Sequence, residues 1–157
     1  MIRQFQFEAE IYESLSCVPM QARRKLDAVG IKVHLAQWQQ LARGERLMIC
    51  HAPADSEEEQ SALRTFIEEV ALARTGSPAK ILPDEASRSA NPPDHPPRVL
   101  ARHARASGLV LDDTAWAALD DDQRYALIKL GDLENPNPNL KLALQEFFES
   151  GSRAESS

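Results

Sequence analysis

Glycine is scarce in this chain, at six of 157 residues. The sequence contains none of the glycine motifs that cradle phosphates or present a catalytic serine, such as G-x-G-x-x-G, the P-loop and G-x-S-x-G. The zinc-protease motif H-E-x-x-H is missing too. Because no nucleophile or acid–base pair can be assembled from the remaining residues, we expect a protein that is not an enzyme.

Cysteine is also scarce, and Cys17 and Cys50 lie far apart in the sequence. Zinc sites usually show short paired spacings such as C-x2-C, which this chain lacks. Cys50 falls in an apolar helical segment, where a free cysteine behaves as a small buried hydrophobe. We therefore expect no metal, no other cofactor and no disulfide framework, which is typical of a reducing compartment.

Long apolar runs and an excess of basic charge are missing as well. The apolar stretches are too short to cross a bilayer, and the N-terminal sequence MIRQFQFEAE becomes acidic at once, unlike a secretory signal. The net charge is −6, and neither half of the chain is a basic module of the kind that binds nucleic acid. We expect a cytoplasmic protein that binds neither membranes nor nucleic acid.

What the chain does contain is an internal repeat, in which the segment 19–46 recurs as the segment 97–124. The two segments share seven identities over 28 positions, where about two are expected by chance from average composition. The pattern G-x7-W-x2-L-x4-R occurs in both, first at Gly30, Trp38, Leu41 and Arg46 and then at Gly108, Trp116, Leu119 and Arg124. Two copies of a unit of about 30 residues favour an internal duplication rather than a long solenoid.

The fold class predicted from these patterns is all-α, a compact helical domain of about eight helices built from two related halves. We expect a single domain over 1–151, with half one at 5–76, half two at 98–150, and a frayed tail at 152–157. The intervening segment 77–97 holds six of the ten prolines, so we expect an irregular linker there.

Helix ends can be read from capping residues. Ser56-x-x-Glu59 is a capping box that predicts the start of the clearest helix, which runs to Gly76. We expect Gly131 to end a later helix in the same way. Residues 2–11 fit either strand alternation or helical spacing, and we favour an extended start that passes into a short helix.

The residues that recur in both copies have two interpretations. Trp38 and Trp116 lie within apolar stripes and so are expected in the core, although tryptophan is also common at binding hot spots. Arg46 and Arg124 fit a contact between helices, or a face that binds carboxylate or phosphate. We favour the core for the tryptophans and the interhelical contact for the arginines.

Several short segments together carry a resemblance to a known family. They are Phe5-Gln6-Phe7-Glu8, Cys17-Val18-Pro19-Met20, Lys25-Leu26-Asp27, Gly30-Ile31-Lys32, the run from Gln123 to Leu130, and Ala143-Leu144-Gln145-Glu146-Phe147. The chain resembles the nitrate reductase-associated protein family over roughly residues 4–50 and 95–148. The family pattern often has cysteine at the position of Val29, which argues further against a shared cysteine metal site here.

The resemblance implies an accessory role in nitrate assimilation. Such proteins are associated with assimilatory nitrate reductase and molybdenum-cofactor genes, so the expected partner is the reductase or its cofactor machinery. We expect protein–protein docking that helps assembly, maturation or cofactor loading, with Arg23, Lys32, Arg124 and Lys129 as partner-binding residues. The alternative is a carrier of a small ligand or metal cofactor that uses Cys17, His51 and the arginines around a pocket between the halves.

Overall fold

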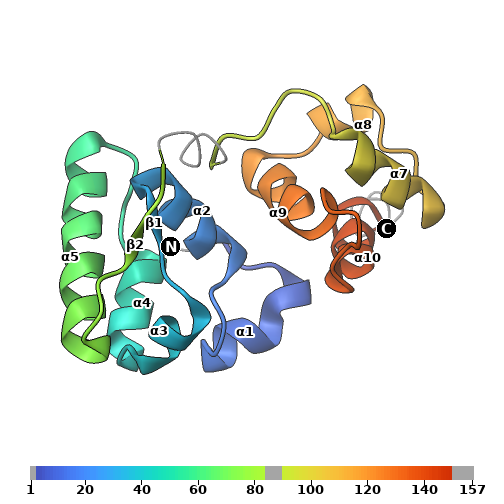
Figure 1. Ribbon diagram of the computed structural model, residues 1–157. Coiled ribbons are helices and arrows are strands. Elements are labelled where there is room, and N and C mark those ends of the chain that lie inside the picture. The colour runs from blue at the N-terminus through green and yellow to red at the C-terminus, as the bar shows by residue number, and fades with distance from the viewer. Residues whose placement is uncertain (1–2, 84–89, 150–157) are drawn as a thin grey trace. The chain divides into compact units, whose positions relative to one another are not determined.

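The computed structural model describes residues 3–83 and 90–149 (Figure 1). Within these ranges the chain is mostly helical, with nine α-helices and one sheet of two short strands. The predicted helical class is therefore confirmed. In the same ranges, no helix is both long and apolar enough to pass through a membrane.

The chain divides into two compact units, which we describe separately. Unit 1 comprises Met1–Gln4 and Glu8–Ala90, and unit 2 comprises Phe5–Phe7 and Asn91–Ser157. The short 3-10 helix η1 (Gln6–Glu8) therefore contributes residues to both units. The grouping of residues 5–7 with the second unit is not visible in the sequence pattern, since the rest of unit 2 begins only at Asn91.

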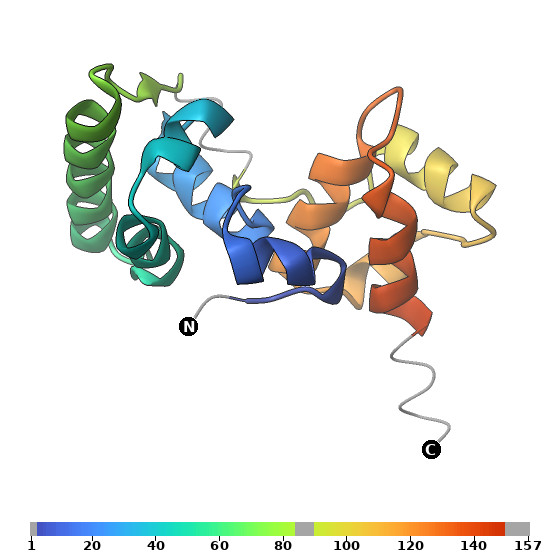
Figure 2. The same cartoon turned by 90° about the horizontal axis from the view of Figure 1, so that it is seen from below.

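Five helices lie in the described part of unit 1, residues 3–4 and 8–83 and residue 90, and they are coloured from blue to green in Figures 1 and 2. They are α1 (Ala9–Ser14), α2 (Met20–Val29), α3 (Leu35–Gln40), α4 (Arg43–His51) and α5 (Glu57–Thr75). The long helix α5 packs on α2, α3 and α4, and it begins at the predicted Ser56–Glu59 capping box. Trp38, Ile49 and Ile67 are fully buried between these helices, so three elements share one apolar core.

The sheet of unit 1 joins two segments that are far apart in sequence. β1 (Ile31–Lys32) pairs antiparallel with β2 (Lys80–Ile81). The expectation of an irregular segment over 77–97 is therefore wrong at Lys80–Ile81. These two residues lie between Pro78 and Pro83, keep their own N–H groups, and so can join a ladder that the prolines cannot join. Residues 84–89 of the expected linker lie outside the described part of the chain.

Unit 2 is built around α9 (Asp121–Gly131), which packs against both α7 (Arg98–Ala106) and α10 (Asn139–Leu144). The short helix α8 (Asp113–Ala117) carries the second tryptophan, and α10 continues as a π-helical turn over Gln145–Glu149. Gly131 is the last residue of α9, so the helix ends at the predicted glycine, although Gly131 does not adopt the left-handed conformation of Gly76. A Cβ atom there would lie 2.5 Å from a methyl carbon of Leu100 and 2.9 Å from one of Leu140. The glycine instead permits the close packing of α7, α9 and α10.

Candidate docking residues

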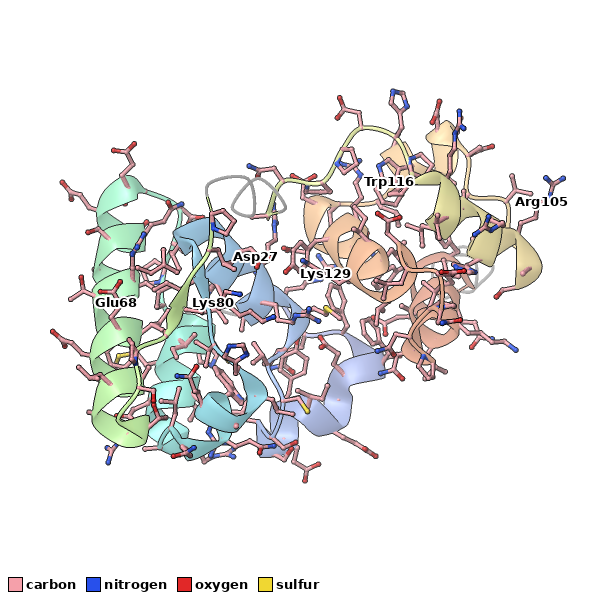
Figure 3. The ribbon with its side chains drawn as sticks, viewed as in Figure 1. Asp27, Glu68, Lys80, Arg105, Trp116 and Lys129 are labelled. Atoms are coloured by element: carbon pink, nitrogen blue, oxygen red, sulfur yellow. The ribbon has the colours of Figure 1, made fainter. Side chains whose placement is uncertain are left out.

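The two tryptophans have matching surroundings in the two units. Both side chains are fully buried, which confirms the expected core position. The indole N–H of Trp38 donates to the carbonyl oxygen of Leu15 at 2.8 Å, and that of Trp116, which is labelled in Figure 3, donates to the carbonyl oxygen of Pro93 at 2.8 Å. Each indole is thus satisfied inside its own unit, and neither is available as an exposed anchor for a partner.

The recurring arginines contact backbone carbonyls close to these tryptophans. Arg46 donates from a terminal nitrogen to the carbonyl oxygen of Leu15 at 2.8 Å. Arg124 donates from Nε to Trp116 O at 3.0 Å, from a second nitrogen to Ala117 O at 3.2 Å, and from a third to Asp121 Oδ1 at 2.9 Å. Arg124 therefore ties the end of α8 to the start of α9, as the interhelical interpretation predicts. Its donors are directed at its own unit.

Two other candidate cations are exposed on unit 1. Arg23 lies on α2, and its guanidinium makes no hydrogen bond or ion pair within residues 3–83 and 90–149. Lys32 lies on β1 directly opposite Lys80 on β2, and both lysines are exposed. Opposite residues of an antiparallel pair have neighbouring side chains, so this pairing places two cations together on the surface of unit 1.

The fourth candidate, Lys129, lies near the end of α9 in unit 2 (Figure 3). Its ammonium nitrogen is 5.3 Å from the centre of the Tyr125 ring, within the range of a cation–π contact. Lys129 follows Arg124 on the same helix at a spacing that is not a whole number of turns, so the two side chains point in different directions around it. The four predicted residues thus divide between the units, two on each.

The residues of the carrier hypothesis differ in exposure. Cys17 and His51 are exposed, whereas Cys50 is buried. Burial raises the pKa of the Cys50 thiol to about 11, although the nearby Lys25 charge partly opposes this shift and Glu8 adds to it. Cys50 therefore stays protonated near neutral pH, when a thiol is a poor metal ligand. Over the described ranges, no three His, Cys, Asp or Glu side chains gather in a group that suits a metal ion.

Two charged residues whose roles the sequence did not reveal, Glu8 and Lys25, form hydrogen bonds between segments of unit 1. The Glu8 carboxylate is 2% exposed and accepts the backbone N–H of Met20 at 3.0 Å and the Tyr12 hydroxyl at 3.2 Å. Lys25 donates to the carbonyl oxygens of Cys50 and Ala52, at 2.6 and 2.7 Å, at the end of α4. A cation at a helix C-terminus is a stabilising arrangement. Lys25 belongs to the basic run Arg23-Arg24-Lys25, which gave no signal that one member faces inward.

A further ion pair joins α4 and α5 at the surface of unit 1. Arg74 Nε lies 3.0 Å from Glu45 Oε1. The Arg74 hydrogen bond, helped by the backbone N–H of Ala42, lowers the pKa of the Glu45 carboxyl. The arginines of this chain that have described partners therefore serve mainly to join its own elements.

The chain belongs to the nitrate reductase-associated protein family. The family model described as conserved nitrate reductase-associated protein matches residues 4–147, which confirms the family expected from the sequence. That description associates its members with nitrate reductase. No curated protein and no solved structure is significantly similar to the chain.

Proposed function

We propose that this member of the nitrate reductase-associated family is a non-enzymatic cytoplasmic accessory protein that docks on nitrate reductase or on its molybdenum-cofactor machinery. Docking would help assembly, maturation or cofactor loading of the reductase. The observation that carries the proposal is the family match over residues 4–147, almost the whole chain. Trp38 and Trp116 are fully buried, so the tryptophans of the repeat belong to the core and do not form the docking surface.

The exposed cations of unit 1 support a docking surface on this unit. Arg23 and Lys32 are exposed, and Lys80 stands beside Lys32, so unit 1 presents cations on a chain of net charge −6. Basic groups on an acidic protein attract an acidic patch of a partner and orient the encounter. We assign docking to Arg23 and Lys32, with Lys129 as a contact of unit 2. Arg124 is assigned to holding α8 on α9, because its guanidinium donates to three groups of its own unit.

A deletion strain tests the proposal directly. Removing the gene should abolish nitrate reductase activity while the reductase polypeptide remains detectable by immunoblot. Complementation with Arg23→Ala plus Lys32→Ala should restore activity poorly, since the docking charges are gone. Lys141→Ala, which removes an exposed lysine of unit 2, is the matched control and should complement fully. Normal activity in the deletion strain would reject the proposal.

We also propose that the two units derive from an internal duplication. Three pairs of helices begin at equivalent positions of the repeat. They are α2 and α7 at residues 20 and 98, α3 and α8 at 35 and 113, and α4 and α9 at 43 and 121. Gly30 and Gly108 both adopt positive φ, at 76° and 84°. Gly30 directly follows α2, and Gly108 follows α7 after the single residue Ser107. The acceptors of the two indole N–H groups, Leu15 and Pro93, are separated by the same offset as the tryptophans themselves.

A capping contact supports the same proposal at a position where the residue types differ. The backbone N–H of Ala42 donates to Glu45 Oε1 at 2.8 Å, and that of Asp120 donates to Gln123 Oε1 at 3.0 Å. Both pairs occupy equivalent positions of the repeat.

Comparison of first and second halves across family members tests the duplication, which predicts G-x7-W-x2-L-x4-R in both halves. Family members that have the pattern in one half only would contradict it.

A further inference from the structure

The short extended link after Gly30 is covered by another segment of unit 1. Ile31 pairs with Ile81 and Lys32 with Lys80 in the antiparallel sheet. The backbone N–H of Leu82 also donates to the carbonyl oxygen of Gly30 at 2.8 Å. Three consecutive residues of this link therefore have a strand beside them.

The corresponding link of unit 2, residues 108–110, has no strand beside it in the described ranges. Its local frame is the same: Gly108 has φ 84°, and Leu111 is buried as Val33 is in unit 1. The carbonyl oxygen of Gly108 and the N–H of Val110 make no hydrogen bond within residues 3–83 and 90–149. Val110 is 71% exposed, although a β-branched apolar residue is typical of a paired strand. An exposed backbone edge of this kind is a template for another strand.

We propose that residues 108–110 bind an extended segment of a partner protein by β-strand addition, in the way that residues 80–82 bind the link of unit 1. The main-chain groups of Gly108 and Val110 supply the hydrogen bonds, and side chains next to them select the sequence. The proposal deepens the docking function and rests on it for the identity of the partner protein. The binding edge itself is tested without that partner.

The residues around the edge specify the partner segment. Val110 occupies the position of the repeat that Lys32 occupies in unit 1, where Lys32 lies opposite Lys80. Because Val110 is apolar, we expect an apolar residue of the partner segment opposite it. Asp112 and Asp113 follow the link where unit 1 has His34 and Leu35. In an antiparallel pair, the residue opposite Asp112 stands two positions before the one opposite Val110. Asp112 accepts the N–H of Ala115 at 2.8 Å through one oxygen, and Asp113 lies 3.1 Å from His95 Nδ1. The segment should therefore read basic-x-apolar, with a lysine or arginine facing the carboxylate of Asp112.

A short synthetic peptide serves as the probe. The capped peptide Lys-Ala-Val-Ile-Leu places its valine opposite Val110 and its leucine opposite Gly108, as Leu82 stands opposite Gly30. Titration followed by amide NMR should shift the signals of residues 108–111 and slow hydrogen exchange of the Val110 N–H. The same peptide N-methylated at its valine is the matched control and should not bind, because it has lost a ladder donor.

Two variants at an exposed position make the test specific. Val110→Pro removes the N–H of the edge and should weaken peptide binding about tenfold, the effect of one lost hydrogen bond of about 1.4 kcal/mol. Val110→Thr keeps the N–H and should bind as the wild type does. Equal binding by Val110→Pro, or shifts at residues 30–32 instead of 108–111, would overturn the proposal. So would a homodimer in analytical ultracentrifugation that Val110→Pro abolishes, since the occupant would then be a second copy.

The deletion strain separates this proposal from the proposed function. Peptide binding that requires the Val110 N–H, together with normal nitrate reductase activity in the deletion strain, would support the edge and reject the docking function. Loss of activity in the deletion strain, with no peptide binding at residues 108–111, would support the function and reject the edge.

Discussion

At the scale of single residues, the fold shifts the ionisation of Cys50. The side chain is 1% exposed on α4, and burial disfavours the charged thiolate. The pKa of the thiol rises from 9.0 to about 11. The folded state therefore favours the neutral thiol, so the free energy of unfolding depends on the pH at which this thiol ionises.

The sign of that dependence follows from the raised pKa. The folded pKa lies above the unfolded one, so the stabilisation is complete below pH 9 and is lost as the pH rises toward 11. We expect wild type to lose about 2 kcal/mol more than Cys50→Ala between pH 7 and pH 10.5. Urea unfolding of both proteins at the two values measures the difference. Cys17→Ala, at an exposed cysteine, is the control, and its free energy of unfolding should change with pH as that of the wild type does. The same pH dependence for wild type and Cys50→Ala would contradict the prediction.

Arg124 shows why a sequence pattern can single out a residue without revealing its role. A guanidinium suits a carboxylate of a partner and a carbonyl of its own chain equally well. The repeat pattern singled out Arg124, but the choice depends on where carbonyl groups end up in three dimensions. The end of α8 brings the oxygens of Trp116 and Ala117 within reach of its donors. Arg23 has no described acceptor of this kind, although it has the same charge.

At the scale of elements, the two units differ in how equivalent helices are capped. The side chain of Asp120 accepts the N–H of Gln123 at 2.9 Å at the start of α9. The equivalent residue at the start of α4 is Ala42, whose methyl group cannot accept a hydrogen bond. The first turn of α4 thus lacks one contact that α9 has.

We therefore expect Ala42→Asp to stabilise the protein and Asp120→Ala to destabilise it, each by about 1 kcal/mol. The new aspartate would also place a negative charge at the positive end of the α4 dipole. Chemical denaturation of the two variants and wild type measures both changes. Ala42→Ser supplies an uncharged cap, so it separates the hydrogen bond from the charge. No gain from either Ala42 variant would show that α4 does not have the free first turn described here.

Two helical glycines give a second contrast between elements. A methyl group at Gly131 meets Leu100 and Leu140 in the core of unit 2, whereas nothing lies within 4 Å of one at Gly44 on α4. Gly131→Ala should destabilise the protein by roughly 1–3 kcal/mol through overpacking. Gly44→Ala should stabilise it by roughly 0.5–1 kcal/mol, because alanine favours a helix. Thermal melts compare the two, and a stabilising Gly131→Ala would contradict the packing around α9.

The elements that were predicted correctly are those defined by local signals. The Ser56–Glu59 box marks the start of α5, and Gly30 and Gly76 end α2 and α5 in the left-handed conformation. The strand Lys80–Ile81 was missed because so short a segment carries no periodicity of its own. Its conformation is set by pairing with β1, which lies much earlier in the chain. The role of Gly131 was missed for the same reason, since its neighbours come from two other helices.

At the scale of the whole molecule, the sequence repeat predicts two related halves, but it does not predict that residues 5–7 group with unit 2. Phe5 and Phe7 stack with ring centroids 5.4 Å apart, and both contact Phe147, at 5.2 and 6.1 Å. The N–H of Phe7 also donates to Glu146 Oε1 at 3.0 Å. These contacts place residues 5–7 in unit 2, although the chain on either side belongs to unit 1. Contacts between the two ends of a chain leave no local trace in its sequence.

The aromatic cluster predicts which unit depends on the N-terminal segment. Phe5 is 3% exposed, so Phe5→Ala should destabilise unit 2 by about 3 kcal/mol through the lost burial and the cavity left behind. Hydrogen exchange should then quicken in α10, next to Phe147, more than in α5 of unit 1. Phe66→Ala, a truncation at a partly buried position of α5, should produce the reverse pattern. If Phe5→Ala left the exchange of α10 unchanged while that of α5 quickened, residues 5–7 would belong with unit 1, and unit 2 would hold its fold without them.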